Sequence, residues 1–195
     1  MGIRVIFQSI EVDGMAIAGA ALIIDEPVED HRGYFTRLWS DNEAANEGFE
    51  HDFNQLNLAF NHRRGTLRGM HFQTKPDAET KLVRVVAGEV WDVILDLRSA
   101  SPTFLAWWGV ELAASNHLAL LLPAGCAHGY QTLADETQVM YQTTHRYVPE
   151  AATGVRHDDP AFAIRWPLAV GEISSADAGW AYWQEDDPRA FAGVA

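Results

Sequence analysis

Alternating apolar and polar residues in short runs, separated by turn residues, dominate the middle of the chain. Residues 83–86 and 90–97 form two such runs on either side of Ala87-Gly88-Glu89, a pattern that predicts a β-hairpin. Successive side chains of a strand point to opposite faces, so the second run has two distinct faces. One face carries Trp91, Val93, Leu95 and Leu97, and the other carries Asp92, Ile94 and Asp96.

Further strands are predicted at residues 107–112, 117–122 and 138–147, with only one short helix, near residues 42–48. Strands this numerous and this closely spaced favour an all-β sandwich or barrel over a βαβ sheet. We expect a single domain over residues 1–195, with a barrel core at about 52–148 and additional strands before it. From residue 149 onwards we expect loops and short elements wrapped over the barrel, in which Trp166, Trp180 and Trp183 pack.

Charge and cysteine content narrow the function classes. The formal net charge of -13 opposes binding to nucleic acid or to an anionic membrane, so an anionic ligand requires a local group of cations. Cys126 is the only cysteine, which excludes a disulfide within the chain and a zinc site built from several cysteines. The apolar residues 15–24 are too few to span a membrane and lack the basic start of a signal peptide. These features predict a cytoplasmic protein.

Several common motifs are absent from the sequence: a glycine-rich phosphate loop, G-x-S-x-G, H-E-x-x-H and C-x-x-C. Their absence argues against a nucleotide-binding fold and a zinc protease. The pattern P-x-G-x-x-H at residues 123–128 instead resembles the second motif of the cupins, which are small jelly-roll barrels. Metal-binding cupins carry H-x-H in their first motif, but here Gln73 stands where the second histidine would be. We therefore predict no tightly held catalytic metal and no cofactor.

Four patterns occur in order and carry a more specific resemblance. They are G-x-x-R-G-x-H-[FY]-Q, K-L-V-R-V-x-x-G-E-V-x-D-V-x-x-D-x-R, S-P-T-F and P-x-G-x-A-H-G-[FY], at residues 65–73, 81–98, 101–104 and 123–130. This set is similar to that of the dTDP-4-dehydrorhamnose 3,5-epimerase family, and the likeness runs from about residue 30 to residue 177. The resemblance implies a metal-free cupin-type jelly-roll barrel with short peripheral helices that epimerises a nucleotide-linked 4-keto-6-deoxy sugar.

Epimerisation beside a ketone requires a base on one face, a cation near the ketone oxygen and an acid on the other face. His71 is the candidate base, because imidazole titrates near neutrality. The resemblance implies that Asp177 orients this ring, that Lys81 stabilises the enolate oxygen, and that Tyr141 returns the proton. Without the resemblance, Lys81 could be an edge-strand gatekeeper and Tyr141 a core aromatic residue.

The resemblance also implies a set of substrate-binding residues. Arg32 and Arg68 match the cations that contact the diphosphate, and planar guanidinium groups suit that role. Gln55 and Asn57 match polar positions beside the nucleotide and the sugar. If the strand at 138–147 is continuous, Tyr147 points into the same cavity as Tyr141. The set is completed by His128, for which a structural role inside the barrel is the alternative.

Family members exchange a strand between subunits, so the resemblance implies a homodimer, with Arg32 acting across the interface. Two departures from the family pattern, Leu-Ala-Phe-Asn at residues 58–61 and Arg37, leave the nucleotide and the epimerised carbon open. Three alternatives therefore stand beside epimerisation of dTDP-4-dehydro-6-deoxyglucose at C3 and C5. They are an epimerase specific for C3 or for C5, a metal-dependent cupin enzyme, and a non-catalytic sugar-nucleotide binding protein.

Overall fold

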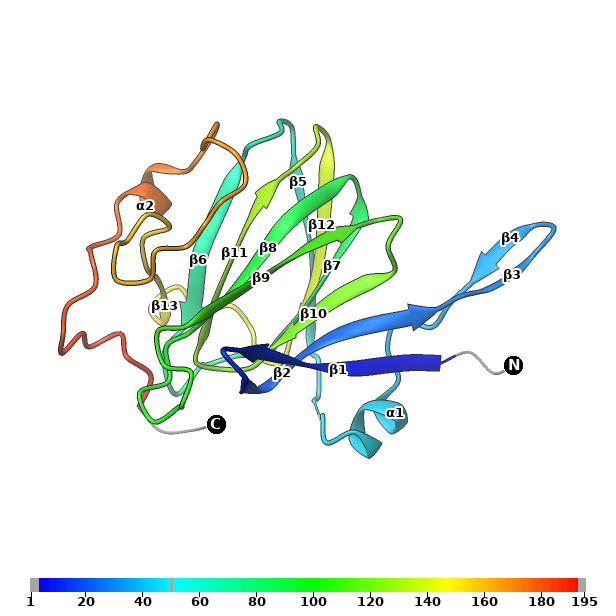
Figure 1. The fold of residues 1–195 in the computed structure, drawn as a ribbon, viewed down its shortest axis with the longest axis horizontal. Helices are drawn as coiled ribbons and strands as arrows, with labels where there is room; N and C mark the ends of the chain where they lie inside the picture. Colours follow the sequence, from blue (N-terminus) through cyan, green and yellow to red (C-terminus); the bar gives the residue numbers. More distant parts are fainter. Residues whose placement is uncertain (1–3, 50, 193–195) are drawn as a thin grey trace.

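Two antiparallel β-sheets face each other in the computed structural model, which describes residues 4–49 and 51–192 (Figure 1). The extreme ends of the predicted domain lie outside the described residues. The six-stranded sheet has the order β1 (Arg4–Val12), β2 (Met15–Glu26), β10 (Leu118–Leu122), β7 (Lys81–Ala87), β12 (Thr137–Thr143), β5 (Gln55–Asn61). The five-stranded sheet has the order β13 (Ala152–Gly154), β6 (Leu67–Gln73), β11 (Cys126–Thr132), β8 (Glu89–Asp96), β9 (Trp107–Ala113).

Between β5 and β12 the chain crosses repeatedly from one sheet to the other. Only β8 and β9 follow each other within one sheet, and they pair antiparallel from Glu89–Ala113 to Leu95–Trp107. This alternation is the connectivity of a jelly roll, and it brings residues of both sheets to one barrel interior. The predicted all-β, cupin-type jelly-roll fold is confirmed.

The hairpin predicted around Gly88 is wrong. The turn itself is present, since Gly88 has a left-handed φ of +74, and a Cβ there would lie 2.4 Å from Thr137 Oγ1. The two strands nevertheless separate after it, because β7 pairs with β10 and β12 whereas β8 pairs with β11 and β9. Glycine at a turn reports where the chain bends, but tertiary burial selects the partner of each strand.

Other local predictions are closer to the structure. The segments at 107–112 and 117–122 became β9 and β10, whereas the strand expected over 138–147 ends at Thr143. The short helix is α1 (Asp41–Asn46), and the hydroxyl of Ser40 at its N-terminus accepts a hydrogen bond from the Glu43 N–H. The second helix, α2 (Ser175–Ala178), lies in the C-terminal segment.

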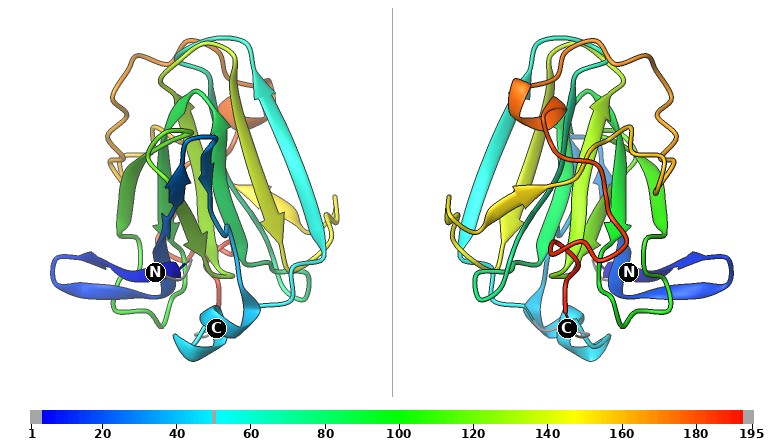
Figure 2. Two further views of the ribbon diagram at one scale, coloured as in Figure 1. Left: turned by 90° about the vertical axis from the view of Figure 1, so that its right-hand side faces the viewer. Right: turned by 90° about the vertical axis from the view of Figure 1, so that its left-hand side faces the viewer.

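The core has an inner and an outer part. Ile94 of β8 joins the cluster that fills the barrel interior, together with residues of the opposite sheet such as Val83 and Leu120. Val93, Leu95 and Leu97 point the other way and are covered by the C-terminal segment, where they pack with Phe162, Trp166 and Trp183. The right-hand view of Figure 2 faces this segment, coloured orange to red, as it runs over the five-stranded sheet. Strand β8 is therefore buried on both faces.

The strands β3 (Val28–Asp30) and β4 (Gly33–Phe35) form a hairpin that projects away from the barrel (Figure 1). Each of its strand residues is exposed, including Tyr34 and Phe35. In the described part of the chain, no helix is long and apolar enough to cross a membrane.

Candidate active site

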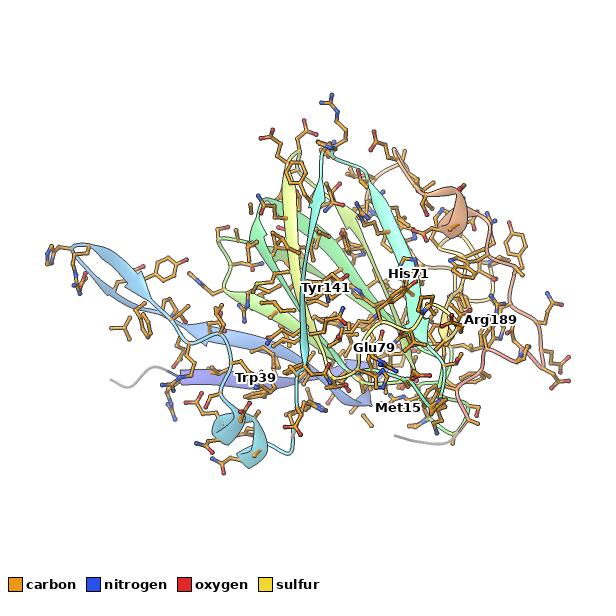
Figure 3. The ribbon with its side chains drawn as sticks, turned by 180° about the vertical axis from the view of Figure 1, so that it is seen from behind. Met15, Trp39, His71, Glu79, Tyr141 and Arg189 are labelled. Carbon is orange, nitrogen blue, oxygen red and sulfur yellow. The ribbon has the colours of Figure 1, made fainter. Side chains whose placement is uncertain are left out.

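A cavity of about 550 Å³ opens between the two sheets and is bounded on one side by the C-terminal segment. Its wall combines residues of β5, β6, β7 and β12 with α2 and with the loop that follows β12. The residues predicted from the sequence that line this cavity are Gln55, Asn57, His71, Lys81, Tyr141, Tyr147 and Asp177. Figure 3 shows His71, Glu79 and Tyr141 on the strands and loop around it.

His71 and Asp177 form a close pair at the edge of the cavity. Their Nε2 and Oδ1 atoms are 2.6 Å apart, and the residues are separated by 106 positions in the sequence. The His71 side chain is 44% exposed, whereas that of Asp177 is only 7% exposed. Asp177 lies in the first turn of α2, where its N–H donates to the Ser174 hydroxyl at 3.0 Å. This helix cap fixes the carboxylate that faces the imidazole.

The electrostatic surroundings of Asp177 favour its ionised form. Burial alone would raise the pKa of this carboxyl, but hydrogen bonds and charge outweigh it and hold the pKa below its ordinary value. The contributors are the hydrogen bond and charge of His71, the Gly69 N–H and the Ser174 hydroxyl. An ionised carboxylate at this position accepts the Nε2–H of His71, so Nδ1 is the ring nitrogen left to exchange a proton with a ligand.

Gly69 is needed for this arrangement. Its φ is +112, and a Cβ would lie 2.5 Å from Gly129 Cα and 2.6 Å from the His128 carbonyl oxygen. Strand β6 can approach β11 this closely only with glycine there. The Gly69 N–H donates to Asp177 Oδ2 at 3.2 Å, so the same residue that brings the strands together also holds the carboxylate.

Lys81, the first residue of β7, lines the cavity and pairs with Glu79, a carboxylate that the sequence patterns did not indicate. Its Nζ lies 3.1 Å from Glu79 Oε1 and 3.4 Å from the His71 carbonyl oxygen. The side chains of Lys81 and Glu79 are 12% and 7% exposed, so the ion pair is enclosed. The spacing of Glu79 and Lys81 could have indicated this pair, because residues two apart in an extended chain share a face.

Gln73 stands at the position of the second metal-ligating histidine of other cupins, and its amide is already in use. The Nε2 group donates to the carbonyls of Asp77 and Arg146 and to the carboxylate of Glu79. The Oε1 atom accepts from the Val148 N–H at 2.6 Å. This side chain therefore ties together the loops on either side of the cavity.

Tyr141 lies on β12 between Asn57 of β5 and Val83 of β7. Burial raises the pKa of its phenol, nearby Arg68 opposes that increase, and Glu79 adds to it. The phenol therefore keeps its proton to a higher pH than an ordinary tyrosine does.

Tyr147 also lines the cavity, although β12 has ended at Thr143, so the shared cavity does not require the continuous strand that was expected. The Tyr147 N–H donates to Gln55 Oε1 at 3.1 Å, and Gln55 Nε2 donates to Asn57 Oδ1 at 2.9 Å. Asn57 Nδ2 is buried and has no hydrogen-bond partner among the described residues. It is a donor that a ligand in the cavity can satisfy.

Arg68 lies beside the cavity and not within its lining. It faces an adjoining cleft of about 400 Å³ whose walls also include His71 and Asp177. Its Nε donates to Asn61 Oδ1 at 2.7 Å, which fixes the guanidinium beside the His71–Asp177 pair.

Two further predicted binding residues, unlike Arg68, line neither this cavity nor the adjoining cleft. Arg32 lies at the tip of the β3–β4 hairpin, where its 78% exposed side chain pairs with Asp30 at 2.5 Å. His128 faces inward from β11, and its Nε2 lies 2.9 Å and 3.0 Å from the two carboxylate oxygens of Asp92. Because its side chain is 10% exposed and absent from the cavity lining, the structure favours the structural alternative for His128.

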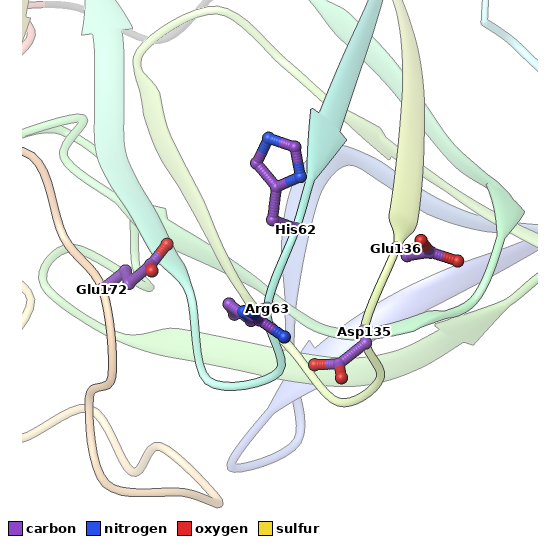
Figure 4. A pocket seen from close by; sticks show the side chains of 5 residues that line it. All are labelled: His62, Arg63, Asp135, Glu136 and Glu172. Atoms are coloured by element: carbon purple, nitrogen blue, oxygen red, sulfur yellow. The ribbon is translucent and has the colours of Figure 1, made fainter.

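A second cleft, of about 540 Å³, lies at the opposite end of β12. It is lined by His62, Arg63, Asp135, Glu136 and Glu172. Figure 4 shows the three carboxylates of this cleft pointing in different directions. Within residues 4–49 and 51–192, no group of three or more histidine, cysteine, aspartate or glutamate side chains is arranged to hold a metal ion. None of the predicted site residues lines this cleft.

Comparisons with known proteins agree with the geometry. A family model described as dTDP-4-dehydrorhamnose 3,5-epimerase matches residues 14–185. A dTDP-4-dehydrorhamnose 3,5-epimerase of Methanothermobacter thermautotrophicus is 40% identical over 168 residues, which are 85% of this chain and 90% of that protein.

Two solved structures are also similar over nearly the whole chain. The dTDP-4-dehydrorhamnose 3,5-epimerase of Bacillus anthracis, with TDP and PPi bound, is 38% identical, with a TM-score of 0.85 over 91% of this chain and 100% of that one. The dTDP-6-deoxy-D-glucose-3,5-epimerase of Legionella pneumophila, in complex with dTDP-4-keto-L-rhamnose, is 31% identical, with a TM-score of 0.88 over 98% and 100%. The chain therefore belongs to the dTDP-4-dehydrorhamnose 3,5-epimerase family and, as an epimerase, is an isomerase.

Proposed function

We propose that this protein epimerises dTDP-4-dehydro-6-deoxyglucose at C3 and C5. The observation that carries the proposal is the His71–Asp177 pair, 2.6 Å apart, in one cavity with Lys81 and Tyr141. Base, cation and acid are the three groups that proton exchange beside a ketone requires. The names of the similar enzymes give the same substrate class.

In the proposed first step, His71 takes the proton from the carbon next to the C4 ketone. The C–H electrons form a carbon–carbon double bond, and the ketone oxygen becomes an enolate. Asp177 stabilises the imidazolium that results, because the ionised carboxylate is bonded to Nε2. Lys81 stabilises the enolate oxygen with its ammonium charge.

In the second step, Tyr141 gives its phenolic proton to the same carbon from the opposite face, and the ketone re-forms. His71 then releases its proton to solvent and Tyr141 regains one, so the site returns to its starting state. The half-exposed ring of His71 and the raised pKa of Tyr141 support this division of roles. Repetition at the other flanking carbon completes a double epimerisation.

Substrate binding is assigned to the polar groups around the reacting pair. Arg68 contacts the diphosphate from the adjoining cleft, where its guanidinium lies in the wall shared with His71. Gln55, Asn57 and Tyr147 contact the sugar and the nucleotide, and the unpartnered Nδ2 of Asn57 supports this part of the proposal.

We further propose that the active form is a cytoplasmic homodimer with exchanged strands, in which the partner provides Arg32. The projecting β3–β4 hairpin, far from its own cavity lining, supports this arrangement. Leu56, Leu58 and Phe60 on the edge strand β5 also support it, because they are 62%, 60% and 43% exposed. A row of exposed apolar side chains on an edge strand is stabilised by a partner surface.

The function is tested by proton NMR of the substrate in deuterated buffer. Loss of both the C3 and C5 proton signals is the expected result. Loss at only one carbon would identify a C3-specific or C5-specific epimerase, and retention of both signals would refute epimerisation. A stoichiometric metal ion found by elemental analysis of the active protein would support the metal-dependent alternative.

The proposed dimer is tested by sedimentation velocity. Leu58→Glu is expected to produce a monomer, whereas Glu136→Gln, in the second cleft, should not.

A further inference from the structure

Glu79 is an enclosed carboxylate whose role the reaction scheme above leaves open. Its side chain is 7% exposed and lines the cavity. One carboxylate oxygen lies 3.1 Å from Lys81 Nζ, and the other accepts from Gln73 Nε2. A buried carboxylate is stable in a protein interior only when its charge is compensated, and here both oxygens have partners.

The geometry around Lys81 leaves one of its protons for a ligand. An ammonium group has three N–H donors. One faces Glu79 and another faces the His71 carbonyl oxygen at 3.4 Å, while the third has no acceptor in the part of the chain that the structure describes. A lysine on a flexible four-carbon stem would otherwise sample many positions.

We propose that Glu79 is a positioning residue for the epimerisation, holding the Lys81 ammonium so that its remaining N–H points to the substrate ketone oxygen. The inference rests on the proposed function. Gln73, two residues after His71 on β6, holds Glu79 in turn, so base and cation are placed by one connected set of side chains. Correct distance between the two groups matters because the proton leaves as the enolate charge forms.

Glu79 also acts on Tyr141 through its charge. The ionisable groups that line the cavity with this phenol or act on it are Arg68 and His71 on β6, Lys81 on β7, Tyr130 on β11, His145 and Tyr147 after β12, Asp177 on α2, and Glu79 itself. Burial is the main cause of the raised pKa of Tyr141, Arg68 opposes it, and Glu79 contributes further. Removing the Glu79 charge therefore lowers the pKa of the proton donor.

The test compares Glu79→Gln with Glu136→Gln, which removes the same charge from the second cleft at the opposite end of β12. Glu79→Gln is expected to lower kcat by about 10- to 100-fold, the usual effect of losing a group that orients a reacting one. KM should change by less than about threefold, because the proposed role of Glu79 is in the chemical step and not in substrate binding. The alkaline decline of kcat should move to lower pH, and Glu136→Gln should match the wild type in all three measurements.

A kinetic double-mutant cycle tests whether Glu79 acts through Lys81. Lys81→Met should be as slow as Glu79→Gln/Lys81→Met, because the second change removes a partner whose target is already absent. Slow rates are measured as deuterium incorporated into the substrate. This comparison does not need the Glu79→Gln single variant, so it remains available if that variant does not fold.

Three results would overturn the inference. One is a Glu79→Gln enzyme with wild-type kcat and an unchanged pH profile. Another is a further tenfold loss when Glu79→Gln is added to Lys81→Met, which would mean that Glu79 acts independently. Wild-type protein without turnover would refute the proposed function and this inference together, whereas wild-type turnover with either of the first two results would refute the inference alone.

Discussion

Two histidine–aspartate pairs lie side by side in this protein and have different surroundings. His71 on β6 and His128 on β11 are direct partners in the strand register, and Nε2 of each ring contacts a carboxylate. The side chain of His71 is 44% exposed and that of His128 is 10% exposed. Asp177 reaches His71 from the C-terminal segment, whereas Asp92 reaches His128 from the neighbouring strand β8.

The comparison shows that a histidine–aspartate pair alone does not define a catalytic site. An enclosed pair such as His128–Asp92 satisfies two buried polar side chains and contributes to the stability of the barrel. The His71–Asp177 pair has the same chemistry but borders a cavity, so its second ring nitrogen remains available to a ligand. Variants of the two pairs test this contrast.

His71→Ala should reduce turnover by about 10³-fold, or about 4 kcal/mol of transition-state stabilisation, because a positioned general base is lost. The rate of deuterium incorporation into the substrate measures this loss. Calorimetric binding of dTDP should persist and serves as the control for folding. Full turnover in this variant would assign the chemistry to another residue.

Asp177→Asn should reduce turnover by about 100-fold, since an orienting partner is replaced by an amide that cannot stabilise the imidazolium. Steady-state kinetics provide the measurement. Asp92→Asn is the matched control, because it makes the same change in the enclosed pair. An equal loss of turnover per folded molecule in Asp177→Asn and Asp92→Asn would contradict the difference proposed between the two pairs.

His128→Ala should act mainly on stability and lower the free energy of unfolding by about 1–3 kcal/mol, because Asp92 is left buried without its partner. Urea unfolding gives this value, with His71→Ala as the comparison. A His128→Ala protein as stable as the wild type would contradict the structural role of the enclosed pair.

The pH dependence of stability should show the contribution of the ionised Asp177 carboxylate to the free energy of unfolding. Its folded-state pKa is below the ordinary value of 3.8, so its contribution is complete above that pH and is lost as the pH falls through the folded value. The difference in melting temperature between the wild type and Asp177→Asn should therefore narrow only below about pH 4. A difference that narrows already between neutrality and pH 5 would exclude a lowered pKa for this carboxyl.

The sequence was sufficient for the fold class because strand alternation and turn residues are local signals. It was insufficient for strand pairing, and the wrong hairpin at Gly88 shows why: the turn does not say to which sheet each strand goes. The order of the motifs predicted that His71, Lys81 and Tyr141 share a site, and all three line one cavity in the structure. Their chemical roles stay predictions until the variants are measured.

Glu79 and Arg32 show two further limits of sequence analysis. Glu79 is informative only once its burial beside Lys81 is known, because a glutamate two residues before a strand is usually exposed. Arg32 lies on a hairpin outside its own cavity, so the binding role proposed for it requires a second copy of the chain, which no pattern within one sequence can position.

The 106-residue separation between His71 and Asp177 has a consequence for biosynthesis. The last strand of the six-stranded sheet ends at Thr143, yet the carboxylate proposed to orient the base belongs to a helix starting at Ser175. A nascent or clipped polypeptide that ends before this helix contains every strand of the two large sheets but lacks Asp177. Under the proposed mechanism, the His71 imidazole is therefore oriented for catalysis only once the C-terminal segment has packed against the barrel.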